Sequence, residues 1–213
     1  MLTGVTGLVD AVSFFGLGHV FTANMTGNVV FLGFAVAGAP EVSVARSMTS
    51  LGAFLVGAAL GGRLGLSMAA TSRRRWLLTV SMAEAGLLFA AALVSIGFDV
   101  GSVPSSRLYT VIVLTALAMG LRNATVRQLA VPDLTTTVLT LTLTALASES
   151  SLAGGTNPRV RRRVVSVALM FVGAAIGTVL VRMGLALPLA LSGVCVLAAT
   201  VAYADVPGPA PAV

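Results

Sequence analysis

The chain has 213 residues, of which 57% are hydrophobic and only 9% are charged, and its formal net charge is +6. Soluble domains carry about 25% charged residues, so this composition excludes a water-soluble globular protein and predicts helices embedded in lipid. Every basic residue is an arginine, and the arginines stand in short stretches between apolar segments, which is typical of cytoplasmic loops and not of a nucleic-acid interface.

Four apolar segments make up the first half of the chain, and we predict a helix for each. They cover residues 2–21, 26–39, 44–70 and 76–98. The segment 26–39 is too short to cross a membrane alone, because its 14 residues reach only about 21 Å as a helix and the hydrocarbon core is about 30 Å thick.

Four more apolar segments follow in the second half, over residues 108–130, 134–149, 164–183 and 186–204. The segment 134–149 is rich in threonine and could be read as a strand in a soluble protein. An isolated strand in lipid would leave its backbone groups unpaired, so we predict a short helix there. The proline-rich tail, residues 205–213, is expected to be disordered.

The two halves present the same order of parts: a span with a polar residue inside it, a polar break, a short segment, and two ordinary spans. The polar residue is Asp10 in the first half and Asn123 in the second, and residues 7–11 align with residues 120–124. The predicted division is a single transmembrane domain over 1–204, with repeat 1 over 1–106 and repeat 2 over 107–204.

The arginines predict how the repeats are oriented. Arg73–Arg75 follow the segment 44–70, whereas Arg159–Arg163 precede its counterpart 164–183. If both clusters are cytoplasmic, the two helices run in opposite directions and the repeat is inverted. We therefore predict an all-α membrane protein with about six net crossings, an inverted 3+3 repeat, broken or re-entrant helices near 26–39 and 134–149, and both termini in the cytoplasm. Eight complete spans are the alternative.

A glycine face marks the segment 44–70. Gly57, Gly61 and Gly65 recur every four residues, which is the spacing that lets two helix backbones approach closely in lipid. The sequence leaves open whether this face packs within one chain or between the copies of a homo-oligomer.

Two polar stretches interrupt the apolar pattern, one around residues 21–28 and a weaker one around residues 132–137. A break inside a membrane helix frees backbone groups that side chains, water or a ligand must satisfy. In secondary transporters such breaks meet at the interface of inverted repeats and bind the substrate there. The alternative is that they only begin the short helices, with Thr26 as an N-cap. The candidate substrate-binding residues are Asp10, Asn24, Thr26, Gly27, Asn28, Arg122, Asn123, Thr136 and Thr137.

Asp10 is the most informative of these residues. A carboxylate inside a span costs about 2.5–3.5 kcal/mol on insertion scales, so it must be neutral, paired or close to water. Arg122 in the related span is its expected partner, and the sequence leaves open whether Asp10 couples protons or cations or forms a structural ion pair. Glu84 lies about two turns after Trp76, so we expect it to reach the cytoplasmic interface and to have a structural role.

Several of these stretches resemble a known family. Residues 7–13 read Gly-Leu-Val-Asp-Ala-Val-Ser, residues 23–28 read Ala-Asn-Met-Thr-Gly-Asn, and residues 119–124 read Met-Gly-Leu-Arg-Asn-Ala. Together with the Val-Pro-Asp-Leu run that begins at Val131, they resemble the YoaK-like family of bacterial inner-membrane proteins. The resemblance implies about six spans and no established activity. Leu141 departs from the pattern, which has a glycine there.

No nucleotide-binding, nucleophile-elbow or zinc-protease motif is present in the sequence, so we predict neither an enzyme nor a cofactor or metal site. The leading hypothesis is a small-solute or ion transporter of the bacterial inner membrane, with its site at the interface of the two repeats. The alternatives are a non-transporting membrane interaction or assembly protein and, less favoured, an intramembrane enzyme. The predicted partners are membrane lipid and an unknown solute or ion.

Overall fold

The computed structural model describes residues 1–68, 72–97, 105–129, 139–157 and 159–203, and all regular structure in these ranges is helical. Each of the eight predicted apolar segments contains an α-helix, so the all-helical prediction is confirmed. The helices are α1 (Leu2–Gly16), α2 (Met25–Val36), α3 (Val44–Met68), α4 (Arg73–Val94), α5 (Ser105–Gln128), α6 (Leu139–Ser148), α7 (Val160–Val181) and α8 (Ala186–Tyr203), with a short 3-10 helix η2 (Ser151–Ala153).

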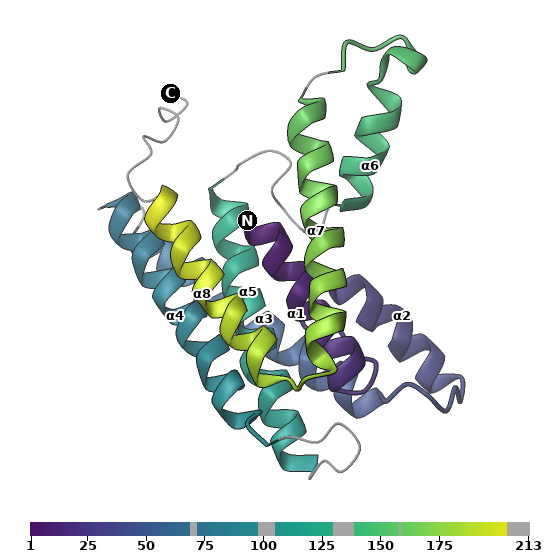
Figure 1. Ribbon diagram of the computed structural model, residues 1–213, viewed down its shortest axis with the longest axis vertical. Coiled ribbons are helices and arrows are strands. Elements are labelled where there is room, and N and C mark those ends of the chain that lie inside the picture. The colour runs from purple at the N-terminus through teal and green to yellow at the C-terminus, as the bar shows by residue number, and fades with distance from the viewer. Residues whose placement is uncertain (69–71, 98–104, 130–138, 158, 204–213) are drawn as a thin grey trace.

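The helices pack in pairs that come from opposite halves of the chain. The most extensive contacts join α3 to α5 and α1 to α7, and α4 lies along α8. The two short helices are more peripheral, because α2 packs mainly on α3 and α6 mainly on α7. In Figure 1, α1, α4 and α7 run downward while α5 and α8 run upward, and the starts of α4 and α7 lie toward the same end.

Glycines bring the backbones of the two main pairs together. A Cβ added at Gly57 on α3 would overlap the backbone of Leu117 on α5, and one added at Gly173 on α7 would overlap the backbone of Gly4 on α1. Gly61 likewise lies against Leu121. The predicted glycine face on α3 therefore packs within the chain, and α7 carries an equivalent face that the sequence analysis overlooked.

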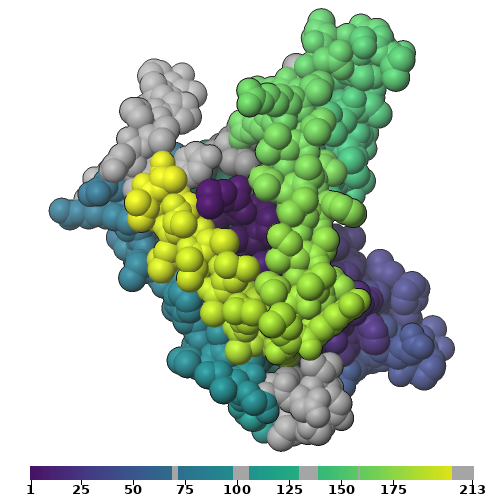
Figure 2. Space-filling model, in the orientation of Figure 1, coloured from purple at the N-terminus to yellow at the C-terminus, as the bar shows by residue number. Residues whose placement is uncertain are grey.

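The outer surface of the helices is apolar. Large hydrophobic side chains such as Leu66, Phe171 and Val201 are exposed, which is what a surface covered by lipid requires. Four helices, α3, α4, α5 and α7, are long and apolar enough to cross a membrane, and the other four are shorter apolar helices. In Figure 2, α6 and the first turns of α7 project beyond the rest of the described chain.

The glycine contacts generate a stability prediction. Gly57→Ala should lower the free energy of unfolding by about 1–3 kcal/mol, because the new methyl group must push α5 away from α3. Gly62→Ala is the matched control on the same helix, since an added Cβ there meets no other atom within 4 Å. It should leave stability unchanged or slightly raised. Reversible unfolding in mixed detergent micelles measures both, and equal losses would contradict the packing.

Candidate functional site

The chain turns back on itself after α1. Helix α1 ends at Gly16, and residues 17–24 return along it before α2 begins at Met25. The backbone N–H of Ala23 donates to Asp10 Oδ1 at 3.0 Å, although the two residues are thirteen positions apart. The predicted polar break is therefore held against the middle of α1, and a carboxyl group of α1 holds it there.

Asn28 closes the other side of the break. Its Oδ1 accepts from the Phe21 N–H at 2.9 Å and its Nδ2 donates to the Phe21 carbonyl at 2.6 Å. The side chain is fully buried, and the paired bonds imitate those of a neighbouring strand. Asn28 thus holds the break in place, and its predicted role in binding a substrate stays a prediction.

Helix α3 completes the support of the break. Ser50 Oγ donates to the Phe21 carbonyl at 2.6 Å, and Arg46 Nη1 donates to the Gly18 carbonyl at 3.1 Å. Side chains of α1, α2 and α3 therefore satisfy the freed backbone groups of Gly18, Phe21 and Ala23, as burial in lipid demands.

The start of α2 differs from the expected cap. Asn24 occupies the N-cap position and makes no side-chain capping bond, while Thr26 lies inside the first turn. The prediction that Thr26 is an N-cap is therefore wrong. Its hydroxyl is exposed and lines a cavity instead.

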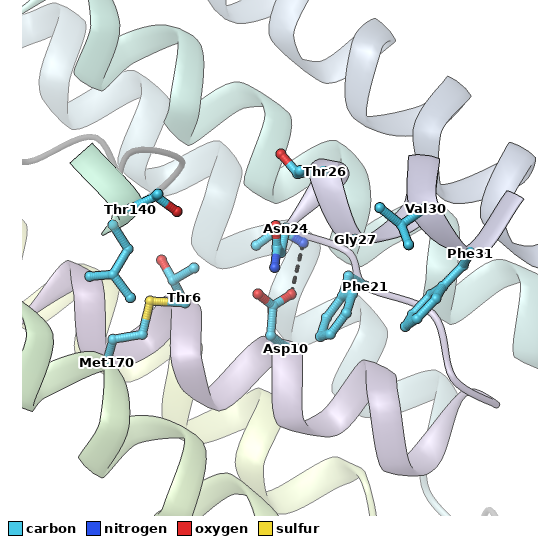
Figure 3. Close-up of a pocket in the computed structure, with 12 residues that line it drawn as sticks. Thr6, Asp10, Phe21, Asn24, Thr26, Gly27, Val30, Phe31, Thr140 and Met170 are labelled. Atoms are coloured by element: carbon cyan, nitrogen blue, oxygen red, sulfur yellow. Dashed lines mark hydrogen bonds between the residues drawn. The ribbon is translucent and has the colours of Figure 1, made fainter. Parts of the chain in front are cut away.

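That cavity has a volume of about 400 Å³ and lies between the break, α1, α2, the first turn of α6 and α7 (Figure 3). Its polar wall consists of Thr6, Asp10, Asn24, Thr26 and Thr140. The remaining lining residues are Phe21, Ala23, Gly27, Val30, Phe31, Leu139 and Met170. A mainly apolar pocket of this size with a few convergent polar groups is the usual form of a small-molecule site.

Asp10 is the charged residue of this cavity wall. It is 5% exposed, and while Oδ1 accepts from Ala23, Oδ2 is buried with no hydrogen-bond partner in the described part of the chain. A buried carboxylate oxygen without a partner is costly, so this group calls for a proton, water or a ligand. In Figure 3 the side chains of Asp10 and Thr6 rise from α1 toward Asn24.

Arg122 does not pair with Asp10, so that prediction is wrong. Its guanidinium forms an ion pair with Glu84 of α4, and its Nη1 donates to the Leu2 carbonyl at 3.1 Å and to Thr6 Oγ1 at 3.2 Å. Position 123 is the one that aligns with Asp10, and neighbouring residues on a helix point about 100° apart. Arg122 therefore faces α4 and the start of α1.

The position of Glu84 also differs from the prediction that it reaches the cytoplasmic interface. It is 3% exposed and does not reach a surface, because Arg122 holds it between α4 and α5. Trp76 is buried with Val80 and Leu121 and does not lie at the protein surface. Charge neutralisation inside the bundle explains how a chain this apolar accommodates both ions.

The remaining predicted residues divide into two groups. Asn123 lies apart from the cavity, and its Nδ2 donates to the Met119 carbonyl of its own helix at 2.8 Å. Thr136 and Thr137 fall outside the described residues. Asp10, Asn24, Thr26 and Gly27 do come together in the cavity wall.

Sequence reasoning missed two kinds of lining residue. Thr6 precedes Asp10 by one helical turn and shares its face, so the helical period could have identified it. Phe21 and Phe31 gave no signal, because an aromatic residue in an apolar segment is usually core or faces lipid.

These features define a multi-pass helical membrane protein with a polar cavity beside a broken helix. Residues 1–202 match the family described as "Protein of unknown function (DUF1275)", and the chain belongs to that family. It is similar to the UPF0700 transmembrane protein YoaK of Bacillus subtilis (strain 168), with 34% identity over 154 residues. The match covers 71% of this chain and 65% of that relative, so the chain spans less than two thirds of the relative's length. No solved structure matches the chain.

The buried ion pair can be tested by a double-mutant cycle. Glu84→Leu or Arg122→Leu alone should destabilise the protein by about 3–5 kcal/mol, because each leaves an uncompensated buried charge. The double variant should lose less than the sum of the two, since it removes both charges. Unfolding free energies in mixed micelles measure the cycle, and strictly additive losses would argue against the pair.

Proposed function

We propose that this protein is a permease of the bacterial inner membrane and that the cavity beside Asp10 is its solute site. The observation that carries the proposal is the buried Oδ2 of Asp10, which has no hydrogen-bond partner among the described residues. Asp10 lines a cavity at the point where the helical structure is interrupted between α1 and α2. Transporters place their substrate sites at such discontinuous helices.

The pattern of helix contacts supports an inverted 3+3 repeat. Exchanging the two halves converts the α1–α7 pair into α5–α3, and α2–α3 into α6–α7. At equivalent close contacts, Gly7 lies against the backbone of Met170 and Gly120 against that of Phe54. Helices α1 and α5 run in opposite directions, as do α4 and α8 (Figure 1), which is the relation expected of inverted halves.

This arrangement accommodates six net crossings. We propose that α1 and α2 together cross the membrane once, because the break returns along α1 before α2 continues in the direction of α1 (Figure 1). By the same logic α5 and α6 make one crossing. With Arg73–Arg75 and Arg159–Arg163 in the cytoplasm, both termini are cytoplasmic.

The peripheral helices suggest how the cavity opens. Each short helix packs mainly on one long helix of its own half, α2 on α3 and α6 on α7. Both short helices contribute to the cavity wall, through Thr26 and Thr140. A shift of either helix with its partner would therefore change access to Asp10, which is the rocking motion of alternating-access transporters.

The non-transporting alternative accounts less well for the site. A protein that used its breaks only for packing would need Asn28, Ser50 and Arg46, which satisfy the loop backbone. It would not need an unpartnered carboxyl oxygen beside a cavity of about 400 Å³.

Flux through purified protein in proteoliposomes tests the proposal. Across a panel of anionic, neutral and cationic solutes, we expect at least one to move, and Asp10→Asn to slow that flux at least about tenfold because the charge at the site is lost. Ser13→Ala is the matched control, since Ser13 is one turn away on α1 and its hydroxyl donates to the Asp10 backbone carbonyl at 3.1 Å, not to the carboxyl group. Absence of flux for every solute, or full flux through Asp10→Asn, would contradict the proposal.

The topology is tested separately by cysteine labelling. In a Cys195→Ala background, Arg74→Cys and Arg162→Cys should both react with a membrane-impermeant maleimide only after the cells are permeabilised. Modification of the two positions from opposite sides would rule out the inverted arrangement.

A further inference from the structure

We propose that the solute of this site is a small organic cation with an ammonium group, such as an alkylamine in its protonated form. The inference rests on the proposed permease function and adds the chemical class of the solute. It follows from the charge, the hydrogen-bonding groups and the apolar surface that meet in the cavity.

The described cavity wall offers a carboxyl group and no cationic side chain. Asp10 is the one ionisable residue among those that line the cavity in the described part of the chain. Arg122 contacts this wall through Thr6, but its charge is matched by Glu84, with which it forms an ion pair, and its Nη1 also donates to the Leu2 carbonyl. Because Glu84 already matches the charge of Arg122, an anion would meet the Asp10 carboxylate uncompensated, whereas a cation would pair with its Oδ2.

Other polar side chains line the cavity with Asp10. Thr6 lies one turn before Asp10 on α1, Asn24 approaches from the break, and Thr140 lies across the cavity at the start of α6 (Figure 3). An ammonium group has several N–H donors and no acceptor. Hydroxyl and amide oxygens beside a carboxylate match that donor set, and the carboxylate bond would be charge-assisted.

The remaining lining residues are mainly apolar, so they favour contact with hydrocarbon groups over contact with water. Phe21 and Phe31 both line it, with ring centroids 5.5 Å apart and ring planes 13° apart, and Val30 and Met170 extend the apolar surface. Gly27 allows Phe21 to pack there, because an added Cβ would press on the Phe21 ring.

The volume of the cavity favours an organic cation over a bare metal ion. A water molecule occupies about 30 Å³ in the liquid, and a cavity of about 400 Å³ has room for many. A dehydrated metal ion would fill little of it and would leave the aromatic wall without a function. An alkylammonium ion places its charge at Asp10 and its carbon chain against the apolar surface of Phe21 and Phe31.

Binding to the purified full chain in detergent tests the inference independently of transport. The probes are n-butylammonium, n-butanol and n-butyrate, which have similar shape and differ in charge. Isothermal titration calorimetry should show saturable binding of n-butylammonium alone. Asp10→Asn should weaken that binding at least about tenfold, and Phe31→Leu about two- to fivefold, while Ser13→Ala should leave it unchanged.

Three results would overturn the inference: no binding of n-butylammonium, equal binding of the alcohol or the carboxylate, or unchanged affinity in both Asp10→Asn and Phe31→Leu. If Asp10→Asn does not fold, the n-butylammonium affinity of Phe31→Leu alone decides, and an unchanged affinity overturns the inference. Failure of the permease proposal looks different, because n-butylammonium would then bind with the expected dependence on Asp10 while no solute crosses proteoliposomes. Conversely, flux restricted to anions or neutral solutes would keep the permease and reject the organic cation.

Discussion

The structure depends on one constraint: a chain that breaks a helix inside a membrane must satisfy every backbone group that the break exposes. Here the break folds back on α1, and three helices supply the missing bonds. Asp10 accepts from Ala23, Asn28 pairs with both polar groups of Phe21, and Ser50 adds a second bond to the Phe21 carbonyl. The position of the break, and with it the cavity, is fixed by these few contacts.

Asp10 links that constraint to function because its two oxygens do different things. Oδ1 holds the break in place through Ala23, whereas Oδ2 is buried with no hydrogen-bond partner among the described residues and is the oxygen that we propose for the solute. A ligand that draws the carboxylate toward itself would lengthen the bond to Ala23 and loosen the start of α2. In the proposed permease, one side chain would thus couple solute binding to the conformation of the break, which is the differential contact that a conformational switch requires.

Much of this architecture could be predicted from the sequence. The apolar segments predicted the eight α-helices of the described chain, and the polar stretch between the first two predicted the break. Lipid permits few other structures for an apolar chain. Side-chain direction was harder: Arg122 was expected at Asp10 and instead meets Glu84, since one residue along a helix turns a side chain by about 100°. The aromatic wall and Thr140 depend on how distant helices meet, and no local pattern encodes that. Thr136 and Thr137 remain predictions.

The most direct test of this account is whether water reaches the cavity in the membrane. In a Cys195→Ala background, Asn24→Cys and Thr140→Cys should both react with a small, water-soluble methanethiosulfonate reagent, because both positions line the cavity. Leu60→Cys is the control, since Leu60 is 48% exposed on the outer face of α3 and should be shielded by lipid. Reaction at positions 24 and 140 that is no faster than at position 60 would contradict an aqueous site beside Asp10.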